Sequence, residues 1–198
     1  KDAGDFQKHF TDDKRLFLED PARLRWRRPW FFEYSIGPSY YYSTNLKVGK
    51  TIGYSVSANI GQWMSSAIGL RAGINLTNAA WTKASETTSL LGKSGVSLDA
   101  MLNPFGFTRH YNWDSPVGLN LYGGYELGQL QLVHTNINDK TSGRYAGYRL
   151  GAQFWAKITN DLRLTFEPNY ILIEHFDRPD GRMKYSQTDF KLGLAVLF

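Results

Sequence analysis

Residues 68–76 read IGLRAGINL, and the regular alternation in this stretch decides the fold. Every even-numbered residue in it is apolar, whereas the odd-numbered ones are glycine, arginine or asparagine. Successive side chains of a β-strand point to opposite faces of the sheet. The stretch therefore predicts a strand with one oily face and one polar or small-residue face.

The same period of two recurs along most of the chain, and no segment shows the longer period of an amphipathic helix. Segments of about ten residues are long enough to cross a bilayer as tilted strands. The sequence predicts an all-β fold, an antiparallel up-and-down transmembrane β-barrel of about eight strands with a polar, plugged lumen. The predicted strands cover residues 30–42, 51–61, 66–77, 95–103, 117–127, 148–157, 162–172 and 189–198.

The chemistry of the two faces indicates which one meets lipid. The apolar face carries no charged residue, as expected where a charge at mid-membrane costs about 2–4 kcal/mol. The polar face is mainly Gly, Ser, Thr and Asn, which suit the narrow lumen of a small barrel. Its charges are mixed in sign, which favours a lumen filled by ion pairs over an open channel. The predicted lumen charge network is Glu33, Arg71, Asp99, Glu126, Arg149, Lys157, Arg163, Glu167, Asp189 and Lys191.

A soluble barrel with its oily face inside is the alternative to this interpretation, with the same charges facing water. Composition excludes several other classes. The chain of 198 residues has no cysteine, so it has neither a disulfide framework nor a thiolate metal site. It has no run of eighteen apolar residues, so a transmembrane helix is excluded. Its net charge of +5 is not gathered on one patch, which argues against nucleic acid as a partner.

Aromatic residues and connection lengths predict how the barrel sits. Short connections at 61–65 and 158–161 alternate with longer polar ones at 78–94, 128–147 and 173–187, although 43–50 is short and 104–116 is long. Short turns face the periplasm in outer-membrane barrels, so both barrel termini are expected there. Two aromatic belts are expected: Trp30, Phe31, Phe32, Trp63, Phe105, Phe107, Tyr111, Trp113 and Phe198 at one rim, and Tyr40, Tyr41, Tyr42, Tyr145 and Tyr148 at the other.

Residues 1–29 lack the alternation and form a charged segment before the barrel, which spans 30–198. We expect a periplasmic arm or linker. The arm carries Arg23, Arg25, Arg27 and Arg28, which either contact an acidic partner or anionic lipid headgroups, or belong to a solvated tether to an upstream domain. Because the sequence starts at Lys1, it is either a mature chain or a piece of a longer protein.

The last residues, FKLGLAVLF, place apolar side chains at every second position and end on an aromatic residue. This ending, formed by Phe190, Leu192, Leu194, Val196 and Phe198, resembles the signal that the barrel-assembly machinery recognises. Residues 30–198 resemble the eight-stranded barrel of the outer-membrane protein A type. The stretch 99–128, DAMLNPFGFTRHYNWDSPVGLNLYGGYELG, is similar to the version found in Bacteroidota. No peptidoglycan-binding domain follows, so the resemblance implies the fold and a bacterial outer membrane, not cell-wall anchoring.

The leading functional hypothesis is a non-enzymatic barrel that acts as an accessory or structural subunit of an outer-membrane protein complex, without a cofactor. Expected partners are outer-membrane lipid and lipopolysaccharide, the assembly machinery during insertion, and other outer-membrane proteins. A lipid A- or phospholipid-modifying enzyme is one alternative, with Ser186, His175 and an acid from Glu174 or Asp177 as a conceivable catalytic group that no motif supports. A narrow pore and an adhesin are the others. Glu174, Asp177 and Asp180 are weak candidates for calcium ligands, because PDGR at 179–182 is typical of a turn.

Overall fold

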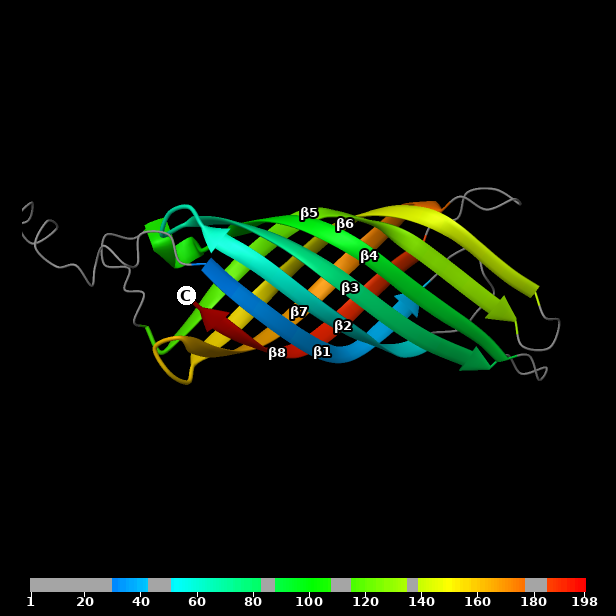
Figure 1. Cartoon of the computed structure of the whole chain (residues 1–198), viewed down its shortest axis with the longest axis horizontal. Coiled ribbons are helices and arrows are strands. Elements are labelled where there is room, and N and C mark those ends of the chain that lie inside the picture. The colour runs from blue at the N-terminus through cyan, green and yellow to red at the C-terminus, as the bar shows by residue number, and fades with distance from the viewer. Residues whose placement is uncertain (1–29, 43–50, 83–87, 108–114, 135–138, 177–184) are drawn as a thin grey trace, which may run out of the picture.

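Eight strands close into one barrel in the computed structural model, in the order of the chain (Figure 1). The structure describes residues 30–42, 51–82, 88–107, 115–134, 139–176 and 185–198. A single 3₁₀ turn, η1 (Pro104–Phe107), is the helical element among them, and no helix of the described part is long and apolar enough to cross a membrane. The strands are β1 (Trp30–Tyr42), β2 (Thr51–Trp63), β3 (Ile68–Thr82), β4 (Thr88–Leu102), β5 (Val117–His134), β6 (Asp139–Lys157), β7 (Leu162–Phe176) and β8 (Tyr185–Leu197).

Every strand pairs antiparallel with its neighbour in sequence, and β1 closes the cylinder by pairing with β8. At this seam Trp30 and Phe198 exchange two backbone hydrogen bonds, of 3.0 and 2.9 Å. Closure satisfies backbone groups that an open edge would expose to hydrocarbon. The end of the barrel that holds Trp30 and Phe198 is called the termini end below, and the opposite end the loop end.

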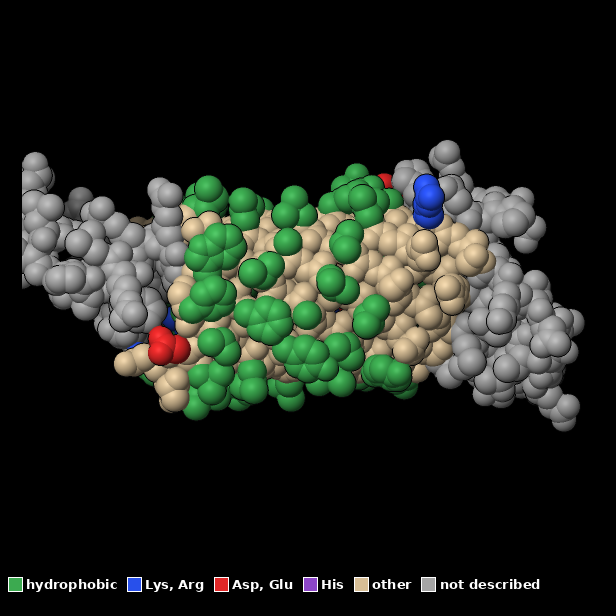
Figure 2. Space-filling model, viewed as in Figure 1, with side chains coloured by type: hydrophobic (Ala, Val, Ile, Leu, Met, Phe, Trp, Pro, Cys, Tyr) green, Lys and Arg blue, Asp and Glu red, His purple; other side chains and the backbone are tan. Residues whose placement is uncertain are grey.

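The alternation sorts side chains to the two faces as predicted. The outer face carries exposed apolar side chains, such as Ile52, Leu98 and Leu150 with 62, 62 and 67% of their surface exposed. Figure 2 shows apolar side chains spread over the barrel wall on the face in view. The polar side chains point inward and are buried, Arg71 and Glu167 being 1 and 0% exposed. An apolar surface of this extent is stable only against lipid, so the predicted fold class, a transmembrane barrel with a plugged lumen, is confirmed.

The predicted long loops are wrong in extent, because the strands continue through much of them. β5 and β6 run on to His134 and from Asp139, inside the predicted loop 128–147. β3 and β4 extend likewise into 78–94, and β7 and β8 into 173–187. The outward-facing side chains described there are mainly polar, such as Asn78, Gln131 and Arg144, so the apolar outer face ends although backbone pairing continues. The hairpins β3–β4 and β5–β6 reach farther than the other strands at the loop end (Figure 1).

Four of the predicted rim aromatics instead point into the lumen. Phe31 and Trp63 are 5 and 3% exposed, and Tyr41 and Tyr145 are 8 and 3% exposed. Each has an odd residue number, like the polar lumen residues of its own strand. Its position near a strand end was therefore predicted correctly, but the direction of its side chain was not. The remaining described members of the two belts are exposed on the outer face or at the rims: Trp30, Phe32, Phe105, Phe107, Phe198, Tyr40, Tyr42 and Tyr148. Tyr111 and Trp113 lie outside the described residues, as do residues 1–29 with their four arginines.

Candidate functional site

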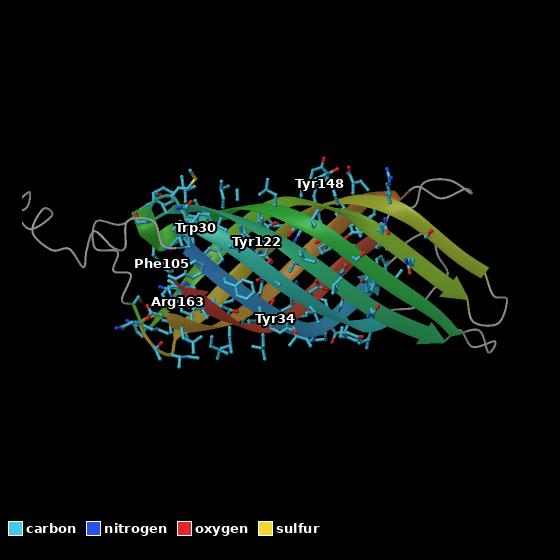
Figure 3. The ribbon with its side chains drawn as sticks, viewed as in Figure 1. Trp30, Tyr34, Phe105, Tyr122, Tyr148 and Arg163 are labelled. Atoms are coloured by element: carbon cyan, nitrogen blue, oxygen red, sulfur yellow. The ribbon has the colours of Figure 1, made fainter. Side chains whose placement is uncertain are left out.

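The centre of the lumen is organised around Arg71 of β3. Its guanidinium binds Asp99 of the neighbouring strand at 2.9 Å (Nη2 to Oδ2) and Glu167 of β7 across the barrel at 3.0 Å (Nη1 to Oε2). A third carboxylate, that of Glu33, lies 3.4 Å away. Arg71 also stacks over the ring of Tyr122 at 4.1 Å from the ring centre. Figure 3 shows Tyr122 within the barrel wall. One cation therefore joins carboxylates from three separate strands.

Neutral side chains hold these carboxylates in place. The amide Nε2 of Gln153 donates to both oxygens of Glu33, at 3.0 and 2.9 Å, and the Thr165 hydroxyl donates to Glu33 at 2.8 Å. The Tyr122 hydroxyl donates to Glu167 at 2.5 Å. Hydrogen bonds to an ionised acceptor are roughly twice as strong as neutral ones. These contacts stabilise the charged form of buried groups that would otherwise be costly.

A second cluster lies next to the first, toward the loop end. Glu126 forms an ion pair with Lys93 at 2.7 Å and accepts a hydrogen bond from the Tyr145 hydroxyl at 2.6 Å. Arg149 connects the two clusters, because its guanidinium lies 3.4 Å from Glu126 and 3.9 Å from Asp99. Six charged residues from β3 to β7 thus form one continuous network: Arg71, Lys93, Asp99, Glu126, Arg149 and Glu167.

A third group surrounds Asp189 of β8. The Ser39 hydroxyl donates to Asp189 at 2.6 Å and the amide of Gln187 at 2.7 Å. Lys191 lies 3.9 Å from Asp189 and donates to the Ser57 hydroxyl at 3.2 Å. This group ties β8 to β1 and β2, across the seam of the barrel.

The charges of the lumen balance. Among the residues that the structure describes, the buried charged ones are five cations, Arg71, Lys93, Arg149, Arg163 and Lys191, and five anions, Glu33, Asp99, Glu126, Glu167 and Asp189. Nine of these ten were expected from the sequence. Lys157, predicted with them, lies half-buried at the last residue of β6, at the termini end. Arg163 is buried at that same end, where it stacks on Trp155 at 3.9 Å.

Lys93 is the network member that the sequence reasoning missed. It falls inside the predicted loop 78–94, but its parity matches that of Ser97 and Asp99 on the lumen face. Extending the alternation of β4 backward by two residues finds it. Tyr145 was predicted at a rim, and Tyr122 alternates in step with Asn120 and Glu126 on the lumen face of β5. Only their lumen contacts show that they hold carboxylates.

Apolar layers close the lumen at both ends. At the termini end Phe31, Trp63, Met101, Tyr122 and Leu197 pack into one cluster. A cavity of about 20 Å³ beside it, next to Trp155 and Arg163, has room for roughly one water molecule. At the loop end a second cluster consists of Tyr41, Ala79, Leu91, Leu130, Tyr145, Ile171 and Ile173. The ion-pair network is thus enclosed between two apolar layers.

The chemistry of this arrangement is that of a fixed interior. Its charged groups are paired and shielded from both lipid and bulk water, so the lumen can brace the wall and block passage. Among the described residues, no group of three or more acidic, histidine or cysteine side chains is placed to hold a metal ion. The catalytic alternative around His175 has no described geometry, because that side chain lies outside the described part and Ser186 is half-buried at the start of β8.

Solved structures of outer-membrane barrels share this architecture. The chain is similar to neisserial surface protein A, with a TM-score of 0.59 and 16% identity over 85% of this chain and 97% of the other. It is also similar to a major outer-membrane protein of Thermus thermophilus, with a TM-score of 0.55 and 13% identity over 86% of this chain and 99% of the other. Ail, the attachment invasion locus protein of Yersinia pestis, gives 0.55 and 11% over 87 and 99% of the two chains. No protein-family model and no curated protein sequence matches the chain.

The chain has the fold of the small outer-membrane β-barrels. The expected resemblance to the outer-membrane protein A type is confirmed as a likeness of fold, an eight-stranded closed barrel. In this barrel the predicted assembly signal lies on the outer face of β8 and just beyond it. Its members Phe190, Leu192, Leu194, Val196 and Phe198 are 40, 59, 48, 44 and 69% exposed. Its recognition by the assembly machinery stays a prediction.

Proposed function

We propose that this chain is a non-enzymatic outer-membrane barrel that serves as an accessory or structural subunit of a membrane protein complex. The observation that carries the proposal is the filled lumen, in which ten balanced charges lie between two apolar layers. An interior of this kind leaves the outer wall, the two rims and the segment 1–29 as the places for interaction. The fold it shares with solved outer-membrane barrels supports the membrane assignment.

The orientation belongs to the same proposal. At the termini end the connections β2–β3 and β6–β7 take four residues each, although β4–β5 takes fourteen, and at the opposite end the hairpins β3–β4 and β5–β6 project beyond the other strands (Figure 1). Short turns face the periplasm in barrels of this class, so both barrel termini are periplasmic. Segment 1–29 then lies on the periplasmic side, where Arg23, Arg25, Arg27 and Arg28 contact an acidic partner surface.

Co-purification tests the proposal. The full chain, tagged and expressed in its native membrane, is cross-linked, solubilised in mild detergent and separated by native electrophoresis. We expect a complex with defined partner proteins that is lost when Arg23, Arg25, Arg27 and Arg28 are all changed to alanine. Changing Lys1, Lys8, Lys14 and Arg15 of the same segment to alanine removes the same number of cations, and this matched control should leave the complex intact. A chain that migrates alone under these conditions would overturn the proposal.

An adhesin is the second candidate, favoured by the two hairpins that reach beyond the other strands at the loop end (Figure 1). The solved structure of Ail, named as an attachment invasion locus protein, has the same fold. Shortening the β5–β6 hairpin by deleting residues 131–142 should abolish cell attachment if this candidate is right. It should leave the cross-linked complex unchanged if the chain is an accessory subunit. The enzyme alternative fails if cells with His175→Ala show the same lipid A and phospholipid modification as cells with the parent chain.

A further inference from the structure

The outer face of β3–β6 becomes polar at the loop end, just beyond the apolar belt. The residues there are exposed and alternate with buried lumen residues. By contrast, the outer face stays apolar up to the strand ends at the termini end, where Ile68, Leu102 and Val117 are exposed. The polar surface, called the loop-end patch below, consists of Asn78, Ser94, Gln129, Gln131, Ser142 and Arg144.

The strand register brings these residues side by side. Asn78 lies in a row with Gly92, Gln131 and Ser142, and the next row joins the apolar Leu76 of β3 to Ser94, Gln129 and Arg144. Directly opposed residues on neighbouring strands have Cβ atoms about 5 Å apart. Four strands at a spacing of about 4.8 Å give a patch roughly 14 Å wide. That width suits a headgroup of one or two sugar rings.

The patch continues directly into the lipid-facing belt. The next row toward the termini end is Ile74, Val96 and Leu127, which are 57, 59 and 50% exposed. At its side Asn78 donates a hydrogen bond of 3.0 Å to the hydroxyl of the exposed Tyr54. A ligand of the patch therefore has an apolar portion that lies along the belt and a polar portion that meets amides and hydroxyls.

The charge of the patch defines the ligand further. Among the side chains whose exposure the structure describes, the exposed charged ones are those of Arg144 and Asp161, and Asp161 lies at the opposite end. The half-buried Glu174 is on β7, outside the patch. A guanidinium binds phosphate through two parallel hydrogen bonds, and the two glutamines and two serines of the patch can both donate and accept toward sugar hydroxyls.

We propose that the loop-end patch binds the phosphorylated sugar headgroup of a glycolipid in the leaflet around the barrel. The acyl chains of the glycolipid lie against the belt, Arg144 binds the phosphate, and Gln129, Gln131 and Ser94 bind the sugar. The site is on the lipid-exposed wall, so it is independent of the partner contacts proposed for segment 1–29. Failure of the co-purification experiment leaves it untouched.

The test uses the full chain in nanodiscs, with native mass spectrometry to count bound lipids. The probes are diphosphoryl lipid A, its monophosphoryl form and phosphatidylglycerol. We expect diphosphoryl lipid A to bind more tightly than phosphatidylglycerol. Arg144→Ala should weaken its binding about ten-fold, as the loss of a charge-assisted contact does, and Arg144→Lys should restore part of that loss. Gln129→Ala should weaken both forms of lipid A.

Lys157→Ala, which removes a half-buried cation at the termini end, is the matched control and should bind diphosphoryl lipid A like the parent chain. Equal affinity of the parent chain for lipid A and phosphatidylglycerol would overturn the sugar part of the proposal. Unchanged binding in Arg144→Ala, or an equal loss in Lys157→Ala, would overturn the site itself.

Discussion

Arg71 stands at the point where the lumen is most sensitive to a single change. It is fully buried and faces three carboxylates, of which two lie within 3.0 Å of its guanidinium. A buried ion pair adds little net stability compared with apolar packing. Removing one partner, however, leaves the remaining buried charges without a counter-charge. Losing one member of the network should therefore destabilise the barrel far more than the intact network stabilises it.

Replacing Arg71 with methionine should consequently lower the free energy of unfolding by about 3–5 kcal/mol. Urea titration of the refolded barrel in detergent, followed by tryptophan fluorescence, measures the change. Arg144→Met is the control, because that side chain is exposed on the outer wall, and it should shift stability by less than about 0.5 kcal/mol. Equal losses in the two variants would mean that the lumen network is not buried.

Gly123 and Gly124 give a second test within one strand, because they face opposite sides of β5. A Cβ at Gly124 would overlap the Leu98 carbonyl oxygen and the side chain of Asp99, whereas the nearest atoms to a Cβ at Gly123 are 3.8 Å away. Gly124→Val should therefore cost about 1–3 kcal/mol or more through overpacking, and Gly123→Val should be tolerated. Thermal unfolding of the two variants side by side measures the difference. A larger loss for Gly123→Val would show that the inward and outward faces have been exchanged.

At the scale of the strand, the outer faces were predictable and the strand ends were not. Segments such as 68–76 alternate because one face meets lipid and the other meets a lumen of small residues. The alternation therefore predicts both the strand and the side of the sheet to which each side chain points. Beyond the belt the pattern reverses, because Asn78 and Gln129 are polar and exposed while their neighbours Ala79 and Leu130 are apolar and buried in the lumen. The oily outer face that marks a strand therefore ends, although the backbone hydrogen bonds continue. The predicted loops were too long for this reason.

Aromatic residues limited the prediction in a similar way. Phe31 and Trp63 were placed at a rim because aromatic rings are typical of membrane interfaces, yet they form the apolar layer that closes the lumen. An aromatic ring suits either environment, so residue type cannot decide between them. Parity decides, since both residues share the face of Glu33 and Asn59. The charged members of the site were predictable because a charge on the lipid face is excluded.

The last strand allows a test of assembly separate from stability. Phe198 is 69% exposed, and its backbone pairs with Trp30 at the seam of the closed barrel. Phe198→Ala should therefore refold in detergent like the parent chain, while the amount of folded barrel in the outer membrane of cells falls several-fold. Heat-modifiability on gels measures the folded fraction in both settings. Normal insertion in cells would show that the terminal aromatic residue is not part of an assembly signal.

At the scale of the whole molecule, the barrel is a closed wall around a solid interior. The apolar layers at the two ends and the balanced charges between them leave no continuous aqueous path through the described part of the lumen. An ion that entered would have to break paired contacts in a region of low dielectric constant.

Planar bilayers containing the purified barrel should therefore show no stepwise conductance in ordinary salt solutions. Proteoliposome swelling with small sugars is a second readout and should match that of protein-free vesicles. Reproducible channels of constant size, retained after repurification, would contradict a filled lumen and favour the narrow pore.

The central claim is that the oily face of the sheet touches hydrocarbon while the charged face is enclosed. The chain has no cysteine, so single cysteines introduced at positions 70, 121 and 194 can each carry a spin label without a background signal. In lipid bilayers, these labels should collide readily with oxygen dissolved in the hydrocarbon and rarely with a water-soluble nickel chelate. High accessibility to the nickel chelate and low accessibility to oxygen at all three positions would contradict the account.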